Sequence, residues 1–185
     1  MSDTITKLRT SNAAKCVLAL AAAAVLLAVF AQAAPGSGLF FPLVSLWCNL
    51  ALFACVLLVL RVVGVRFDLF QKAVILGLWA AALVYFFWAL DRRSFVYIWD
   101  YFNYINKQYS AEAAFLQGPA AGFQYIFGSF AEDYTNFITL FLDFPFCLSD
   151  RTGDSFAFCQ VFSILPMLLV LLAGLTIKVG QMLQV

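Results

Sequence analysis

Histidine is absent from this chain of 185 residues, and charged side chains make up only 11% of it. Without histidine, neither a histidine-based catalytic dyad nor a histidine-ligated zinc site can form. The five cysteines show no C-x-x-C spacing, so the pattern does not indicate a cysteine-rich metal site. The net charge of +1 supplies no global basic field for nucleic acid, and we expect no nucleic-acid partner.

Apolar residues dominate the composition. They make up 64% of the chain, and Phe alone occurs 21 times. Because a soluble domain usually carries about 25% charged residues, this composition indicates a protein that dissolves largely in a lipid bilayer.

Four apolar runs are long enough to cross a bilayer, which takes roughly 20 helical residues. They lie at about 16–34, 39–60, 73–90 and 156–177. The fold class expected is all-α, a polytopic transmembrane helical bundle. Residues 1–15 form a polar start, and residues 178–185 follow the last run. Pro166 predicts a kink inside that run, which neighbouring helices can tolerate.

The first run has a second interpretation. A basic start, an apolar core and Ala31-Gln32-Ala33 also resemble a signal peptide with an A-x-A cleavage site. We favour an uncleaved span because the run is long for a signal peptide. Both interpretations place the Pro35-Gly36-Ser37-Gly38 turn outside the cell.

Lysine and arginine orient the spans, because cytoplasmic loops are enriched in them. One side collects seven basic residues and the other four, the latter being Arg92, Arg93, Lys107 and Arg151. The sequence therefore predicts a multi-pass protein of the plasma membrane, with both termini in the cytoplasm and residues 91–155 as a long extracytoplasmic loop.

The long loop carries two patterns of helical spacing. The first runs through Ile98, Phe102, Ile105, Tyr109, Ala113 and Leu116, and Gln117-Gly118-Pro119 should stop it. The second runs from Phe123 to Phe141, with Asp143 on its polar face, and Pro145 should end it. We expect two amphipathic helices that lie in the outer membrane interface. They would either cap the bundle or cover a cavity between lipid and water.

Acidic residues in this loop are the candidate catalytic groups. Asp100 sits in an aromatic cluster, and desolvation by its rings could raise the pKa of Asp100 toward a general base's useful range. The cluster consists of Tyr97, Trp99, Tyr101, Phe102 and Tyr104. Glu132-Asp133 is the second candidate. Asp100 and Glu132 together could ligate Mg²⁺ or Mn²⁺ through oxygen. The plainer interpretation is an exposed charge at a helix start for Asp100 and a solvated polar face for Glu132-Asp133.

Two further pairs merit attention. Arg92 and Arg93 could grip a lipid phosphate in bidentate fashion, or could simply anchor a helix end at the membrane surface. Cys147 and Cys159 both fall on or near the outer side, where a disulfide could tie the loop to the fourth span; this pairing stays open.

Two short motifs resemble a known family. Trp99-Asp100-Tyr101-Phe102-Asn103-Tyr104 after a span, and Glu132-Asp133-Tyr134-Thr135-Asn136 further along, resemble the first extracytoplasmic loop of bacterial membrane glycosyltransferases of the GT-C class. The resemblance covers about residues 73–175. It implies that Asp100 is the catalytic base, that Glu132 or Asp133 is an auxiliary or metal-binding acid, and that the donor is a polyprenyl-phosphate sugar. Arg92 and Arg93 as donor-phosphate ligands are an inference from chemistry.

The function expected is therefore transfer of a sugar from a polyprenyl-phosphate donor to a cell-envelope glycan or lipid acceptor. Members of the class have eight or more spans, so the chain would be the N-terminal part of such an enzyme or a small protein that shares its motifs. The alternative is a non-enzymatic membrane protein that acts as scaffold or assembly partner of an envelope complex. A transporter subunit fits less well, because the spans carry no buried charge.

Overall fold

The computed structural model describes the backbone of residues 2–92, 99–132 and 135–183, and the side chains of 14–89, 102–132, 135–152 and 155–183. Helices dominate these ranges. Five of them are long or apolar elements that run along the molecule: α1 (Ser2–Ala33), α2 (Phe40–Val62), α3 (Leu69–Arg92), α7 (Gly153–Ser163) and α8 (Leu165–Leu183). Three shorter ones lie at one end: α4 (Trp99–Gln117), α5 (Pro119–Gly128) and α6 (Thr139–Cys147).

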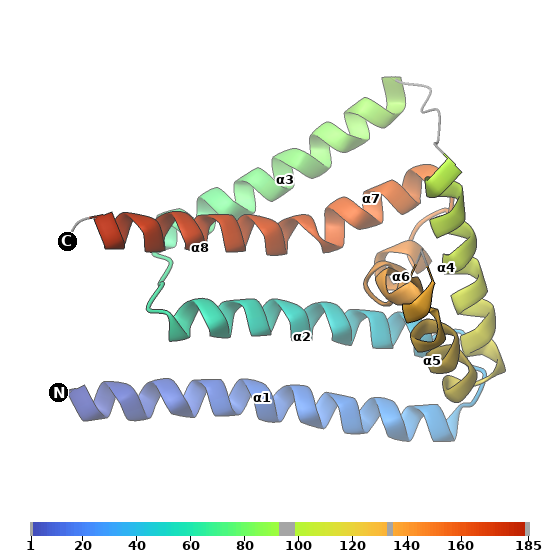
Figure 1. Cartoon of the computed structure of the whole chain (residues 1–185), viewed down its shortest axis with the longest axis horizontal. Helices are drawn as coiled ribbons and strands as arrows, with labels where there is room; N and C mark the ends of the chain where they lie inside the picture. The colour runs from blue at the N-terminus through green and yellow to red at the C-terminus, as the bar shows by residue number, and fades with distance from the viewer. Residues whose placement is uncertain (1, 93–98, 133–134, 184–185) are drawn as a thin grey trace.

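Four apolar helical stretches are long enough to cross a membrane, which confirms the predicted multi-pass character. They are Ala14–Ala33, Phe40–Val62, Leu69–Ala89 and Ser155–Leu183. Figure 1 shows them running along the long axis, with both ends of the chain at the same end of the molecule. Helices α4 to α6 stack across the opposite end, and we call this group, with the short turns between α5 and α6, the cap.

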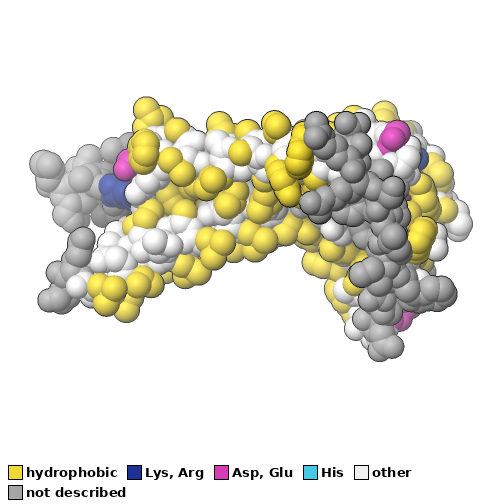
Figure 2. Space-filling view, turned by 90° about the horizontal axis from the view of Figure 1, so that it is seen from above, with side chains coloured by type: hydrophobic (Ala, Val, Ile, Leu, Met, Phe, Trp, Pro, Cys, Tyr) yellow, Lys and Arg dark blue, Asp and Glu magenta, His cyan; other side chains and the backbone are white. Residues whose placement is uncertain are grey.

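Charged side chains avoid the middle of the molecule. On the face that Figure 2 shows, hydrophobic side chains cover the length of the spans, while Lys, Arg, Asp and Glu gather near the two ends. This distribution is the one expected of a chain whose middle third meets hydrocarbon.

Helix α3 begins at Leu69, four residues before the predicted start, because a reciprocal cap precedes it. The Asp68 carboxylate accepts a hydrogen bond from the Gln71 backbone N–H at 2.7 Å, and the Gln71 amide oxygen accepts one from the Asp68 N–H at 3.0 Å. A capping box of this kind satisfies two donors that a helix start leaves unpaired.

The last span is divided into α7 and α8 around Ile164. Pro166 has no backbone N–H, so it cannot bond the carbonyl four residues back, and the helix is interrupted just before it. The predicted kink is therefore present, and Figure 1 shows α7 inclined to α8.

The second predicted loop helix is wrong as a single element. The chain from Phe123 to Phe141 forms α5, then 3-10 turns at Ser129–Ala131 and Asn136–Ile138, then α6. Ser129 and Asn136 cause the break. The Ser129 hydroxyl donates to the Ile126 carbonyl at 2.7 Å and accepts from the Asn136 N–H at 2.7 Å. Short polar side chains of this type offer the backbone an alternative to helix continuation.

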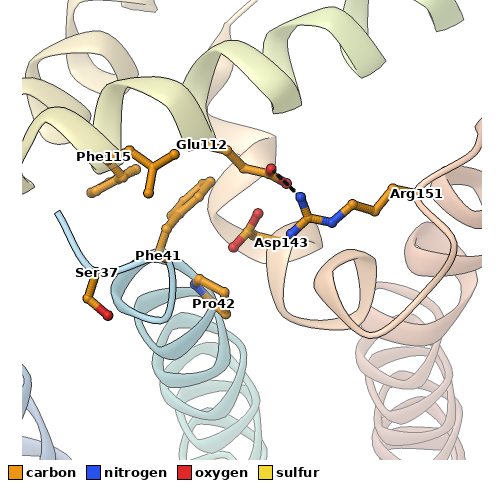
Figure 3. Close-up of a pocket in the computed structure, with 9 residues that line it drawn as sticks. Ser37, Phe41, Pro42, Glu112, Phe115, Asp143 and Arg151 are labelled. Atoms are coloured by element: carbon orange, nitrogen blue, oxygen red, sulfur yellow. Dashed lines mark hydrogen bonds and ion pairs between the residues drawn. The ribbon is translucent and has the colours of Figure 1, made fainter.

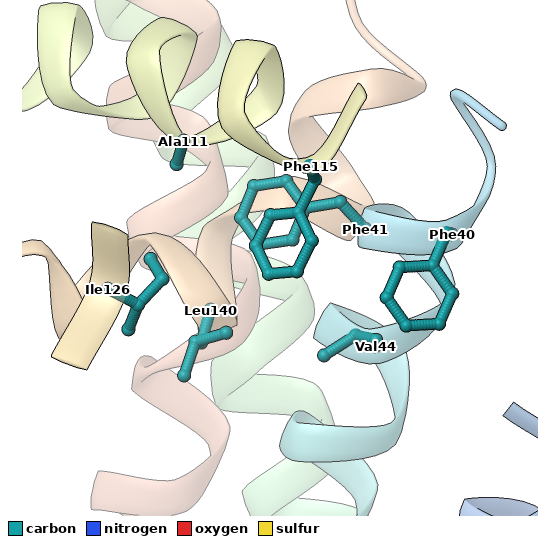
Figure 4. Close-up of a cluster of buried hydrophobic side chains, with 7 residues drawn as sticks. All are labelled: Phe40, Phe41, Val44, Ala111, Phe115, Ile126 and Leu140. Atoms are coloured by element: carbon teal, nitrogen blue, oxygen red, sulfur yellow. The ribbon is translucent and has the colours of Figure 1, made fainter. Parts of the chain in front are cut away.

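Buried apolar side chains concentrate where the cap meets the ends of the spans. One cluster joins α2 to α4, α5 and α6, and Figure 4 shows its members: Phe40, Phe41, Val44, Ala111, Phe115, Ile126 and Leu140. A second joins the cap to α7 through Phe146 and Phe156. A smaller one, with Leu60 and Val170, packs α2 against α8. The cap thus has a conventional hydrophobic core, and this core positions the polar groups described next.

Candidate functional site

Both motif segments belong to the cap, and several of their side chains lie outside the described residues. Asp100 is the second residue of α4, and Arg92 is the last residue of α3, but their side chains are not among those described. Arg93 and Asp133 lie wholly outside the described residues. Glu132 is described, with 58% of its side chain exposed.

Lys107 connects α4, the helix that contains the first motif, to the second motif segment. It follows Asp100 by seven residues, or two turns of α4, and its ammonium lies 3.1 Å from Glu132 Oε2 and 2.8 Å from Asn136 Oδ1. Its side chain is largely buried, with 20% exposed. The segment that begins with Trp99-Asp100 is thereby tied to the segment Glu132 to Asn136.

Asn136 holds the second motif segment in place. Its side chain is buried, its amide nitrogen donates to the Tyr125 carbonyl at 3.1 Å, and its amide oxygen accepts from Lys107. Its backbone N–H is bound by Ser129, as described above. Both polar atoms of this side chain are therefore hydrogen-bonded, and these bonds stabilise the turn between α5 and α6.

The sequence predicted that Asp100 and Glu132 bind Mg²⁺ or Mn²⁺, but the Glu132 carboxylate is already bound to the Lys107 ammonium. The Lys107 ammonium already occupies the position beside Oε2 that a cation would need, and more than half of the Glu132 side chain faces water. The described residues at this place do not fit a metal, and no step of the reaction proposed below passes through one. Among the described residues, no three His, Cys, Asp or Glu side chains form a metal-binding group.

A second polar site lies deeper in the cap, and the sequence did not nominate it. Asp143 of α6 is fully buried, and its Oδ1 accepts a hydrogen bond from Gln108 Nε2 at 2.6 Å. Glu112, one turn after Gln108 on α4, lies beside the Asp143 carboxyl group. Arg151 approaches from the loop after α6 and places a guanidinium nitrogen 3.0 Å from Glu112 Oε2. Figure 3 shows the side chains of Glu112, Asp143 and Arg151 pointing toward one another.

Glu112, Asp143 and Arg151 border a cavity of about 120 Å³. Its other walls come from the turn before α2 and from α2 and α4, including Ser37, Phe41, Pro42, Phe115 and Leu116. Phe41 and Phe115 stack on one another with ring centroids 4.2 Å apart. Apolar walls around two carboxyl groups lower the local dielectric constant, which strengthens every charge interaction inside.

The pKa of Asp143 is raised to about 8, chiefly by burial and then by the charge of neighbouring Glu112 and a hydrogen bond with it. The hydrogen bond from Gln108 and the charge of Arg151 act in the opposite direction. At neutral pH the Asp143–Glu112 pair therefore holds a proton for most of the time. Burial also raises the pKa of the nearby Cys147 thiol.

Arg151 owes its position to a rare backbone conformation. Its φ is +60°, in the left-handed region that non-glycine residues seldom adopt. The Tyr109 hydroxyl donates to its carbonyl, and its N–H donates to the Ser149 hydroxyl at 3.1 Å. These bonds hold the loop so that the guanidinium points back to α4.

The two sites are distinct. Asp100 precedes Glu112 by twelve residues on α4, which corresponds to about 18 Å along the helix axis. A signal for Asp143 was present in the sequence, since it is the one acid in the apolar run from Phe137 to Leu148. Amphipathic spacing placed it on a polar face, and its burial corrects that prediction: α2 and α4 cover it. The cysteines at 147 and 159 are both free, so the open disulfide is not formed.

Comparisons of the chain with protein-family models, with curated proteins and with solved structures return no match. The functional argument therefore rests on the residues and on the geometry of the two sites.

Proposed function

We propose that this chain is a membrane glycosyltransferase, or the N-terminal part of one, that transfers a sugar from a polyprenyl-phosphate donor to a cell-envelope glycan or lipid acceptor. The observation that carries the proposal is the Lys107 connection. It brings the Glu132 to Asn136 segment onto the helix that Asp100 begins. This contact supports the proposal because it holds both motif-bearing segments in one part of the cap.

The location of the cap supports a lipid-linked substrate. The cap lies across one end of the spans, at the level where a membrane-anchored phosphate would emerge from hydrocarbon (Figure 1). The excess of Lys and Arg on the other side supports an extracytoplasmic position for the cap, at the plasma membrane. Impermeant maleimide should label a cysteine at exposed Ser110 in intact cells and should not label one at exposed Leu69. The reverse pattern would contradict this orientation.

An aromatic band supports an interfacial position for the cap helices. Phe123, Phe127, Phe130, Phe137 and Phe141 contact each other in sequence, with ring centroids 5.5 to 6.0 Å apart. Phe127, Phe130 and Phe137 are exposed. Exposed aromatic side chains beside a polar face are typical of helices that lie at a membrane surface.

In the proposed sugar transfer, Asp100 acts as the general base. The Asp100 carboxylate would take the proton of the acceptor hydroxyl as its oxygen forms a bond to the anomeric carbon. The bond from that carbon to the phosphate oxygen would break on the opposite face, so the product is inverted and polyprenyl phosphate leaves. Arg92 and Arg93 would bind the phosphate and offset its growing negative charge.

Asp100→Asn tests this proposal in cells that assemble the glycan. A general base contributes roughly 10²- to 10⁴-fold, so transfer should fall by at least about 100-fold while the donor lipid accumulates. Asp68→Asn is the matched control, because it makes the same chemical change at the other membrane surface and Asn caps a helix as well as Asp. Unchanged glycan in the Asp100→Asn strain, with the protein still inserted, would refute the catalytic role.

The spans favour one alternative, a scaffold for an envelope complex. Between none and 28% of the residues in each span are buried, so large apolar surfaces remain for further membrane helices. A scaffold predicts that deletion of the chain abolishes the glycan while Asp100→Asn leaves it intact. The enzyme predicts that both changes have the same effect.

A further inference from the structure

A groove runs between the membrane-spanning parts of α1 and α2. The two helices are antiparallel neighbours (Figure 1), and the Trp47 indole N–H donates to the Leu20 carbonyl at 3.0 Å across them. Three small side chains, those of Ala19, Ala23 and Ala54, form part of the walls, and the groove has a volume of about 570 Å³. Binding pockets for small organic molecules measure about 300 to 1,000 Å³, so the groove has room for a ligand.

The length of the groove matches one leaflet of a bilayer. Trp47 lines it toward the cap, and Arg61 lines it at the end of the molecule where both chain termini lie. These residues are fourteen positions apart on α2, which corresponds to about 21 Å along the helix axis. A bilayer with its headgroups is about 40 to 45 Å thick, so one leaflet measures about 20 to 22 Å. The groove therefore extends from headgroup level at Arg61 to about the middle of the bilayer at Trp47.

Positive charge collects at the headgroup end of the groove. Arg61 is exposed, and no described acidic side chain forms an ion pair with it. Lys15 immediately precedes Cys16, which lines the groove on α1, and adds a second cation at this end. Asp68, the acid in the connector after α2, already caps the start of α3. A guanidinium binds phosphate in bidentate fashion, and a headgroup of net negative charge fits two cations better than one that brings its own ammonium.

A further transmembrane helix does not fit inside this groove. An α-helix with its side chains is at least about 10 Å across, so a piece about 21 Å long occupies roughly 1,600 Å³. That is nearly three times the volume of the groove. An apolar helix would also leave the Arg61 charge without a partner at the membrane, which is costly. A lipid supplies both a narrow apolar chain and a phosphate.

We propose that the α1–α2 groove binds one anionic phospholipid, from the leaflet on the side of the chain termini. An acyl chain lies between Ala23 and Ala54, and Arg61 binds the phosphate. None of the residues in the span of α1 is buried by protein, so this lipid would supply packing that holds α1 to α2. The inference does not depend on the proposed transfer reaction, because it concerns different residues at the other end of the molecule.

The first test uses Trp47 as the reporter in the full chain, with Trp79, Trp88 and Trp99 changed to Phe. Vesicles of phosphatidylcholine contain a minor fraction of phosphatidylglycerol or phosphatidylcholine that carries bromine near the ends of its acyl chains, where contact quenches tryptophan fluorescence. One basic side chain at the membrane surface should favour phosphatidylglycerol about fivefold in apparent association constant. Equal quenching by the two lipids overturns the proposal. Quenching by neither also overturns it, because protein would then cover the groove.

Arg61→Gln should bring this ratio of association constants close to one. Lys72→Gln is the matched control, because it removes a cation at the same membrane surface from a different groove, which α2, α3 and α8 line. The ratio measured at Trp47 should stay near fivefold in this control. An equal fall in both variants would mean that the surface charge as a whole attracts the lipid, and it would overturn the assignment to Arg61.

The second test leaves every charge in place. Ala23→Phe puts a ring into the groove, whereas Ala22→Phe puts the same ring at an exposed position of α1 that does not line it. We expect Ala23→Phe to displace the acyl chain and abolish the preference for phosphatidylglycerol at Trp47, and Ala22→Phe to keep it. A preference that survives in both variants would place the lipid outside the groove and overturn the proposal.

Discussion

Asn49 of α2 donates a hydrogen bond of 2.8 Å to the carbonyl of Phe141 in α6. Pro145 has no N–H, so it leaves this same carbonyl, four residues earlier, without its helical partner. This explains why α6 continues through Pro145 to Cys147, where the sequence had predicted that the proline ends the helix. A side chain on a membrane span thus replaces a backbone bond of the cap.

Asn49→Leu should loosen the cap. The substitution leaves the part-buried Phe141 carbonyl unpaired, which costs up to about 1 to 3 kcal/mol. Thermal unfolding in detergent should show the loss. The control is Asn106→Leu, the same change at an exposed asparagine of α4, which should shift the transition little. Equal shifts in the unfolding temperature for the two variants would mean that the bond to Phe141 does not stabilise the cap.

Gly122→Ala should disturb the aromatic core. A Cβ at this position would lie 2.2 Å from the Phe115 ring, which stacks on Phe41. The ring must move or the helices must separate, and overpacking of this kind costs about 1 to 3 kcal/mol. Gly128→Ala on the same helix meets nothing within 4 Å and should be neutral or slightly stabilising. Unfolding midpoints that rank the two variants in the opposite order would contradict the packing.

Asn136→Ala should destabilise the cap more than Glu132→Gln does. Asn136 is buried and bonds both Tyr125 and Lys107, so its removal costs about 1 to 3 kcal/mol. Glu132 is more than half exposed, and surface ion pairs contribute less than about 1 kcal/mol. Limited proteolysis of the segment between α5 and α6 provides the measurement. Equal protection in both variants would contradict the role assigned to Asn136.

Stability should fall as pH rises from about 4 to about 8. The pKa of Asp143 is near 8 in the folded chain and near its ordinary value of 3.8 when unfolded. The folded state therefore binds one more proton than the unfolded state over this range, so stability falls as pH rises through it. The contribution is complete below pH 4 and lost above pH 8. Asp143→Asn should flatten the profile; an unchanged slope would assign the proton to another group.

The sequence predicted the elements that local pattern determines. Continuous apolar runs identified the four spans, and spacing of three and four residues identified α4 to within a residue of its observed start and end. The break between α5 and α6 escaped, because it depends on Ser129 and Asn136 bonding to residues seven and eleven positions away. Asp143 escaped for the same reason: only the approach of Gln108 and Glu112 from another helix shows that it is buried.

The position of the hydrophobic core has a consequence for biosynthesis. The cap is made of residues 99–147, yet its core requires Phe40 and Phe41 from an earlier span and Phe156 from a later one. During translation the cap helices are therefore delivered before the partner that completes their packing. The part of the cap core that contains Phe146 can be completed only after α7 has emerged from the ribosome, whereas the part built on Phe40 and Phe41 has its partners earlier.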